Sequence, residues 1–114
     1  MFKVGEIIQI TNASKSKYKE AIGIVVGYCN GTYKDICRVK LWKNKTIQIF
    51  DYNLVKYHIK EDFVSLLNRL SVAHTIERIN DGIIHIKMWH NGKLFRARFV
   101  DAGNWYEFTN WLEG

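Results

Sequence analysis

The dipeptide Asn91-Gly92 separates two runs in which apolar and polar residues alternate. Both residues tolerate a positive φ, so the dipeptide favours a two-residue β-hairpin turn. This turn sets the register of the two strands, and the side-chain period of two then assigns each residue to a face. The predicted apolar pairs are Ile84–Phe99, Ile86–Ala97 and Met88–Phe95; the predicted polar pairs are His85–Arg98 and Lys87–Arg96, with Trp89 beside them.

A helix is expected over residues 62–72, just before this hairpin. Phe63, Leu66, Leu67 and Leu70 recur at i, i+3, i+4 and i+7, which makes a single apolar stripe. An acidic residue at the start, Glu61 or Asp62, complements the positive end of the helix dipole. We expect this stripe to pack on the apolar face of the hairpin.

The strand expected at residues 74–79 has two alternative registers against the hairpin. A three-residue turn at Asn80-Asp81-Gly82 places Glu77 on the polar face beside His85, whereas a two-residue Asp81-Gly82 turn points Glu77 to the apolar face. The sequence does not decide between these turns.

The segment 104–112 also has two interpretations. As a strand in which Val100 pairs with Trp105, it places Glu107 opposite Arg98 and Thr109 opposite Arg96, with Tyr106 and Phe108 on the apolar face. As a helix capped by Asn104, it has a stripe of Trp105, Phe108, Trp111 and Leu112 and gives the α-β-β-β-α order of double-stranded-RNA-binding domains. Its strand-forming Trp, Tyr, Phe and Thr residues favour the strand.

The first half of the chain reads as a succession of short strands. Strands are expected at residues 4–10, 21–28, 35–42, 46–50 and 54–57, with turns at Asn30-Gly31 and Lys43-Asn44-Lys45. On the third strand, Val39 and Leu41 share one face, and Arg38, Lys40 and Trp42 share the other. Five short strands with frequent turn signals predict a small closed barrel.

Two segments of this half resemble the opening of a KOW-type SH3-like barrel. Residues 3–10 read KVGEIIQI and residues 18–26 read YKEAIGIVV; the family has roughly V-G-D-x-V-x-I, then Lys-x-x-x-Gly-x-Val with its characteristic glycine at Gly23. Residues 51–55 are similar to the family's last strand, whereas Glu20 stands where it often has a second Gly. The resemblance covers about half the chain. It implies a binding module for RNA, ribosomal proteins or transcription machinery.

These patterns predict an α+β fold that is mostly antiparallel β. An SH3-like small barrel over residues 1–60 is followed, over residues 61–114, by one helix packed on a three- to four-stranded antiparallel meander. The chain contains no proline and no linker-like stretch, so we expect the two halves to pack as one compact unit.

The excess of basic over acidic residues lies entirely in the first half. The net charge is +6; residues 1–60 hold eleven basic and four acidic residues, and residues 61–114 hold six and seven. This asymmetry indicates an anionic partner, nucleic acid or a nucleoprotein. The candidate binding residues are Lys15, Lys17, Lys19, Arg38, Lys40, Trp42, Lys43 and Lys45 in the first half and Lys87, Trp89, Arg96 and Arg98 in the second.

The sequence also favours a cytoplasmic protein without cofactors. No apolar run approaches the roughly 18 residues of a membrane span, and the start of the chain has no signal-peptide pattern. Cys29 and Cys37 are then expected to stay reduced. Neither the histidines nor the cysteines have metal-ligand spacing, and phosphate-loop and dinucleotide motifs are absent. Spare aromatic residues leave a homodimer open.

Three functions fit these observations. The first is a non-enzymatic protein whose basic half docks on nucleic acid or a nucleoprotein. The second is a phage or mobile-element inhibitor that binds a host nuclease stoichiometrically, as anti-CRISPR proteins do, with Trp89, Trp105 and Trp111 as interface anchors. The third is a metal-independent ribonuclease. Its base would be Glu77 or Glu107, its acid His85, and its phosphorane-binding cations Lys87, Arg96 and Arg98.

Overall fold

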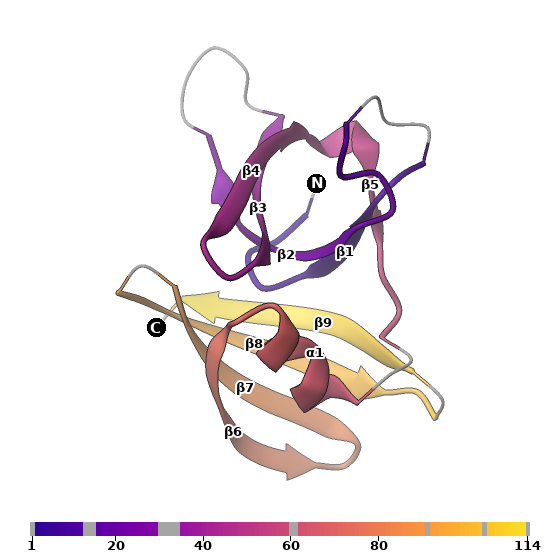
Figure 1. Cartoon of the computed structure of the whole chain (residues 1–114). Helices are drawn as coiled ribbons and strands as arrows, with labels where there is room; N and C mark the ends of the chain where they lie inside the picture. Colours follow the sequence, from indigo (N-terminus) through magenta and orange to yellow (C-terminus); the bar gives the residue numbers. More distant parts are fainter. Residues whose placement is uncertain are drawn as a thin grey trace. The chain divides into compact units, whose positions relative to one another are not determined.

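The computed structural model describes residues 2–12, 16–29, 35–59, 62–90, 92–103 and 105–113, with every side chain in these ranges except those of Arg78, His90 and residues 110–113. The expected turn at Asn30-Gly31 and the proposed cap Asn104 lie outside the described residues. The chain divides into two compact units, Met1–Tyr57 and His58–Gly114, called unit 1 and unit 2. Figure 1 shows one antiparallel sheet in each unit and a short helix in unit 2.

Unit 1 is an open five-stranded antiparallel sheet. Its order is β4-β3-β2-β1-β5, from strands β1 (Ile7–Ile10), β2 (Ile22–Tyr28), β3 (Ile36–Trp42), β4 (Lys45–Phe50) and β5 (Leu54–Lys56), with a 3-10 helix η1 (Asp51–Asn53) before β5. The prediction of a closed barrel is wrong, because β4 and β5 lie at opposite edges and no pairing joins them among the described residues. Strand length and alternation indicate five strands, but they carry no information on whether the outer two meet.

A hydrophobic core cluster of unit 1 lies on one face of this sheet. Its buried members are Ile8, Ile10, Val25, Cys37, Val39, Leu41, Ile49 and Leu54. The Tyr28 hydroxyl accepts a hydrogen bond from the Phe2 backbone N–H at 2.9 Å and donates to Asp51 at 3.3 Å. Tyr28 therefore connects the N-terminal segment and η1 to β2. Cys29 and Cys37 are both free thiols.

The buried Cys37 thiol makes unit 1 sensitive to alkali. Burial, reinforced by the nearby Asp51 carboxylate, raises the pKa of Cys37 from 9.0 to about 12. The unfolded chain therefore loses this proton before the folded chain does, and the stabilisation present below pH 9 is lost as the pH rises towards 12. We expect the free energy of unfolding to fall by at most about 1.4 kcal/mol per pH unit in this window.

Urea denaturation at pH 8, 9 and 10 tests this expectation. Cys37→Val should flatten the decline, because valine cannot ionise and fills the site, whereas Cys29→Ala should keep it. Equal pH slopes for Cys37→Val and the parent would show that the thiol does not contribute.

Unit 2 is a four-stranded antiparallel sheet with one helix, α1 (Phe63–Arg69). The sheet order is β6-β7-β8-β9, from β6 (Ala73–Asn80), β7 (Ile83–His90), β8 (Lys93–Asp101) and β9 (Tyr106–Glu113). The Phe63 ring of α1 lies 4.6 Å from the Phe99 ring and 5.5 Å from the Tyr106 ring, measured between centroids. The predicted apolar stripe is confirmed as buried, and it packs on this sheet (Figure 1).

The helix is shorter than the sequence predicts. It begins after Asp62, whose carboxylate accepts from the Ser65 N–H at 3.1 Å, and it ends at Arg69. Ser71 has φ 55°, and the Ser71 and Val72 N–H groups donate to the Asn68 and Leu67 carbonyls. This is a Schellman motif built on serine rather than glycine, and it ends the helix before residue 72. With one seven-residue α-helix and nine strands among the described residues, the fold is mostly β, and the α+β assignment is wrong.

The central hairpin has the predicted register. All the predicted partners across β7 and β8 face each other, from Met88 with Phe95 to Ile84 with Phe99. The predicted alternative of a strand is confirmed by β9, but Asp101 pairs with Tyr106, so the register near the turn lies two residues away from the prediction. A β-bulge between Arg98 and Phe99 increases this difference to three residues, and Arg96 pairs with Leu112 and not with Thr109. Glu107 consequently lies opposite Val100 and not opposite Arg98.

The turn before β7 has two residues, yet Glu77 does not point to the apolar face. Asp81 and Gly82 both have positive φ, 51° and 76°, and Asn80 pairs with Ile83. A β-bulge between Ile76 and Arg78 then leaves Glu77 as the extra residue of β6. The bulge moves its carboxylate to the polar face. The two alternatives considered from the sequence both assumed a regular strand.

Candidate nucleic-acid interface

Three side chains of unit 1 lie around the Tyr18 ring: Lys17 from the same loop, and Trp42 and Lys45 from the two sides of the turn between β3 and β4. These four residues are called the Tyr18 cluster here. Tyr18 packs on the rim of the unit 1 core, and its ring meets Trp42 edge-to-face at 5.8 Å between centroids. The ammonium groups of Lys45 and Lys17 lie 4.9 and 5.2 Å from the Tyr18 ring centroid. An aromatic pair is therefore flanked by two positive charges.

The loop before β2 holds Tyr18 in this position. The Tyr18 N–H donates to the Ser16 hydroxyl at 3.1 Å, and the Ala21 N–H donates to the Tyr18 carbonyl at 3.0 Å. Glu20, with φ 69°, donates its N–H to the Ile10 carbonyl at 2.7 Å. The first two bonds lie within the loop, and the bond from Glu20 fastens it to β1.

The turn between β3 and β4 supplies the other half of the cluster. Asn44 has φ 60°, and a β-bulge after Lys40 makes Trp42 and Lys45 direct partners. Trp42 keeps 44% of its surface exposed, so the ring is available to a ligand.

The electrostatic environment of the Tyr18 cluster is positive. A hydrogen bond with Lys45, with a smaller contribution from Lys17, lowers the pKa of Tyr18 below its usual value, although burial opposes this shift. Every charged group that shifts this pKa is a lysine. Two ammonium groups held near one ring repel each other, and an anion bound between them would relieve that repulsion.

The other predicted binding residues of unit 1 lie outside the cluster. Arg38 and Lys40 alternate with Val39 and Leu41, whose side chains are in the core, so they occupy the opposite face of β3. The Arg38 guanidinium lies against the backbone of Gly27, where an added Cβ would be 2.8 Å from it. Lys19 and Lys43 are exposed, and Lys15 lies outside the described residues.

Sequence reasoning missed Tyr18 as the centre of this site. Tyr18 stands between Lys17 and Lys19 in the sequence, which is a signal for nucleic-acid contact. Its meeting with Trp42 depends on the curvature of the sheet and on a bulge, and neither is visible in the sequence.

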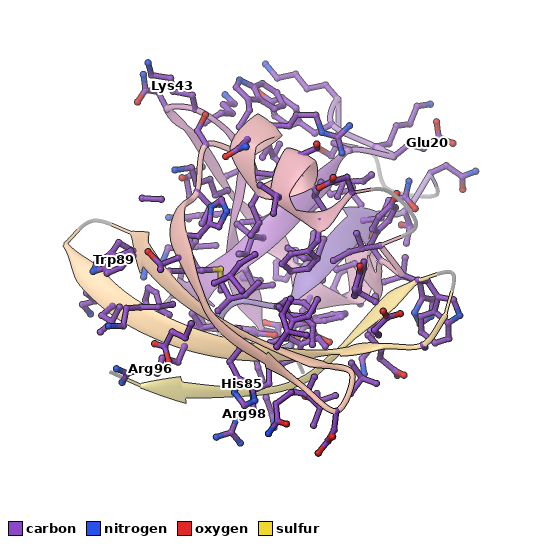
Figure 2. All side chains as sticks on the ribbon, turned by 90° about the horizontal axis from the view of Figure 1, so that it is seen from below. Glu20, Lys43, His85, Trp89, Arg96 and Arg98 are labelled. Carbon is purple, nitrogen blue, oxygen red and sulfur yellow. The ribbon has the colours of Figure 1, made fainter. Side chains whose placement is uncertain are left out.

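A second charged surface lies on unit 2. We call it the β6–β8 polar face; its residues are Glu77, His85, Lys87, Trp89, Arg96 and Arg98. The Glu77 carboxylate accepts a hydrogen bond from Arg96 Nε at 3.0 Å and lies 3.9 Å from Lys87 Nζ. The Lys87 ammonium also lies 5.9 Å from the Trp89 ring centroid. Figure 2 shows His85 and Arg98, which are register partners, side by side.

This geometry argues against Glu77 as a catalytic base. The hydrogen bond from Arg96, reinforced by the charge of Lys87, lowers the pKa of Glu77 below its usual value. A carboxylate stabilised in its ionised form is a weak acceptor for a substrate proton. Glu107, the other predicted base, lies opposite Val100 in the sheet.

Comparison with family models, curated proteins and solved structures finds no match to this chain. The KOW resemblance therefore stays a prediction from short sequence motifs. Among the described residues, no helix is long and apolar enough to cross a membrane. In the same part of the chain, no group of three or more His, Cys, Asp or Glu side chains could hold a metal ion.

Proposed function

We propose that the protein is a non-enzymatic module that binds single-stranded nucleic acid through the Tyr18 cluster. The observation that carries this proposal is the exposed Trp42 ring packed on Tyr18 between two lysines. Proteins that bind single strands combine aromatic rings, on which bases stack, with cations that follow the phosphates.

Each part of the cluster has a separate role in this binding. Trp42 offers a ring face for a base, and its edge-to-face contact with Tyr18 fixes its orientation before binding. Lys17 and Lys45 attract phosphates. No carboxylate is among the groups that shift the pKa of Tyr18. Exposed Lys19 and Lys43, on the same two loops, extend the positive field.

Fluorescence anisotropy with labelled oligothymidylate, oligouridylate and duplex DNA tests the proposal. We expect both single strands to bind more tightly than the duplex, because only they present unstacked bases. Trp42→Ala should weaken binding by about 1–3 kcal/mol. Lys17→Gln with Lys45→Gln should lower the slope of log K against log salt by about 1.4 for a single strand.

Lys3→Gln is the matched control, because Lys3 is exposed in unit 1 and lies outside the cluster. It should bind like the parent apart from a small change at low salt. Unchanged affinity in the combined Lys17, Trp42 and Lys45 variant, or no single-strand binding by the parent at physiological salt, would contradict the proposal.

A further inference from the structure

The face of β3 and β4 that points away from the core of unit 1 brings together a cation, an amide and a ring. Arg38 pairs with Gln48, and Phe50 follows two positions later on β4. Val39 and Ile49 belong to the core, so alternation places Arg38, Gln48 and Phe50 on the opposite face. Arg38 and Phe50 are then diagonal neighbours, a distance of about 7–8 Å that long and aromatic side chains can span.

The backbone of β2 supports the Arg38 guanidinium. Gly27 is the register partner of Arg38, and an added Cβ at Gly27 would lie 2.8 Å from Arg38 Nη2 and 3.5 Å from Arg38 Nε. The guanidinium therefore rests on backbone that only glycine leaves uncovered. Its fork of N–H donors matches a phosphate, and a position set before binding lowers the entropic cost of the contact.

No acidic residue occupies this face of the sheet. The segments Ile36–Trp42 and Lys45–Phe50 contain no Asp or Glu. Among the described residues, no carboxylate forms an ion pair with the exposed Arg38 side chain, and this includes Asp35 and Asp51, which flank the two strands. The Asp51 carboxylate instead accepts the hydrogen bond from Tyr28. The face therefore suits an anionic ligand.

An exposed aromatic ring lies at the end of this face. Tyr52 of η1 stacks on Phe50, with the ring centroids 5.2 Å apart and the ring planes 10° from parallel. The Tyr52 side chain is 69% exposed, so the ring surface turned away from Phe50 can take a base. Arg38, Gln48, Phe50 and Tyr52 are called the Arg38 face here.

Strand β4 separates the Arg38 face from the Tyr18 cluster. Lys45 of the cluster shares its side of β4 with Ile47, which packs on the core, whereas Gln48 points to the other side. Because β4 is an edge strand of the described sheet, no further strand lies across a path from one side to the other. Adjacent residues of a strand are about 3.3 Å apart, so a few nucleotides reach from Lys45 to Gln48.

We propose that the Arg38 face continues the binding path of the Tyr18 cluster around β4, with a phosphate at Arg38 and a base stacked on Tyr52. The ligand class, single-stranded nucleic acid, rests on the proposed function. Arg38 and Tyr52 thus contribute to affinity only when the bound strand is long enough to reach both surfaces.

Fluorescence anisotropy of the full chain with labelled oligothymidylate of about 4 and about 16 nucleotides tests this path. With the long probe, Arg38→Gln and Tyr52→Ala should each weaken binding about five- to tenfold. Arg38→Gln should also lower the slope of log K against log salt by about 0.7. With the short probe, which occupies the Tyr18 cluster alone, both variants should bind within about twofold of the parent.

Arg38→Lys separates the charge of Arg38 from its geometry. It should keep the salt slope of the parent, because the charge remains, and still bind the long probe more weakly, because lysine lacks the fork of donors. Circular dichroism confirms that each variant is folded.

The matched controls are Lys3→Gln, which removes an exposed charge, and Val55→Ala, which shortens an exposed apolar side chain on the opposite edge strand, β5. Arg38→Gln that binds the long probe like Lys3→Gln, Tyr52→Ala that binds it like Val55→Ala, or equal losses with both probes overturn the inference. Losses in the Arg38 and Tyr52 variants without any effect of Trp42→Ala would instead overturn the role of the Tyr18 cluster and leave the Arg38 face as a separate binding surface.

Discussion

Replacing Phe99 by alanine is expected to lower the free energy of unfolding of unit 2 by about 4 kcal/mol. Phe99 has no exposed surface, and its ring contacts the rings of Phe63 on α1 and Phe108 on β9. Truncation leaves a cavity between the helix and the sheet, which adds to the loss of buried apolar area. A typical domain is stable by 5–15 kcal/mol in total, so this loss is a large fraction.

Urea denaturation followed by circular dichroism measures this loss. Val64→Ala is the control, because Val64 is exposed on the same helix and alanine has the higher helix propensity. The control should change stability by less than about 0.5 kcal/mol. A loss below about 1 kcal/mol for Phe99→Ala would mean that α1 does not pack on this ring.

Gly23→Ala is expected to destabilise unit 1 by about 3 kcal/mol. A Cβ at this position would lie 2.6 Å from Val39 Cγ1 and 2.8 Å from the Lys40 carbonyl oxygen. The second contact is with backbone, so β2 and β3 would have to move apart where they pair. The glycine that suggested a family resemblance is therefore required by close packing in this sheet.

Gly92→Ala is the control that separates the steric effect of an added Cβ on stability from the penalty for placing alanine at a positive φ. Gly92 has φ 75° and nothing within 4 Å of an added Cβ, so its substitution meets only the conformational penalty, about 1–2 kcal/mol. Both variants are compared by urea denaturation. A Gly23→Ala loss no greater than that of Gly92→Ala would show that the strands yield easily.

Local patterns predicted the parts of the fold that depend on neighbouring residues. Asn91-Gly92 and the flanking alternation were sufficient for the register of β7 and β8, because a tight turn leaves one pairing that buries the apolar residues. The buried stripe of α1 follows equally from its spacing. The end of the helix could not be predicted from the sequence pattern, because Ser71, with φ 55°, stands where glycine is the usual signal.

Features that depend on irregular backbone were not predicted. The bulge at Glu77 places this carboxylate between Arg96 and Lys87, and the bulge after Lys40 pairs Trp42 with Lys45. A one-residue insertion in a strand exchanges the faces of every residue beyond it, and no residue type marks such an insertion reliably. The Tyr18 cluster and the position of Glu77 each depend on one of these bulges, whereas the other residues of the β6–β8 polar face follow from the hairpin register.

The pairing of β5 with β1 has a consequence for the order in which the chain folds. Ile8 pairs with Lys56, so this contact closes a loop that spans nearly all of unit 1, whereas every strand of unit 2 pairs with its neighbour in the chain. Distant pairings carry a larger entropic penalty and form more slowly than hairpins. During synthesis, β1 therefore keeps one unpaired edge until residue 56 has left the ribosome, and β5 completes the sheet last.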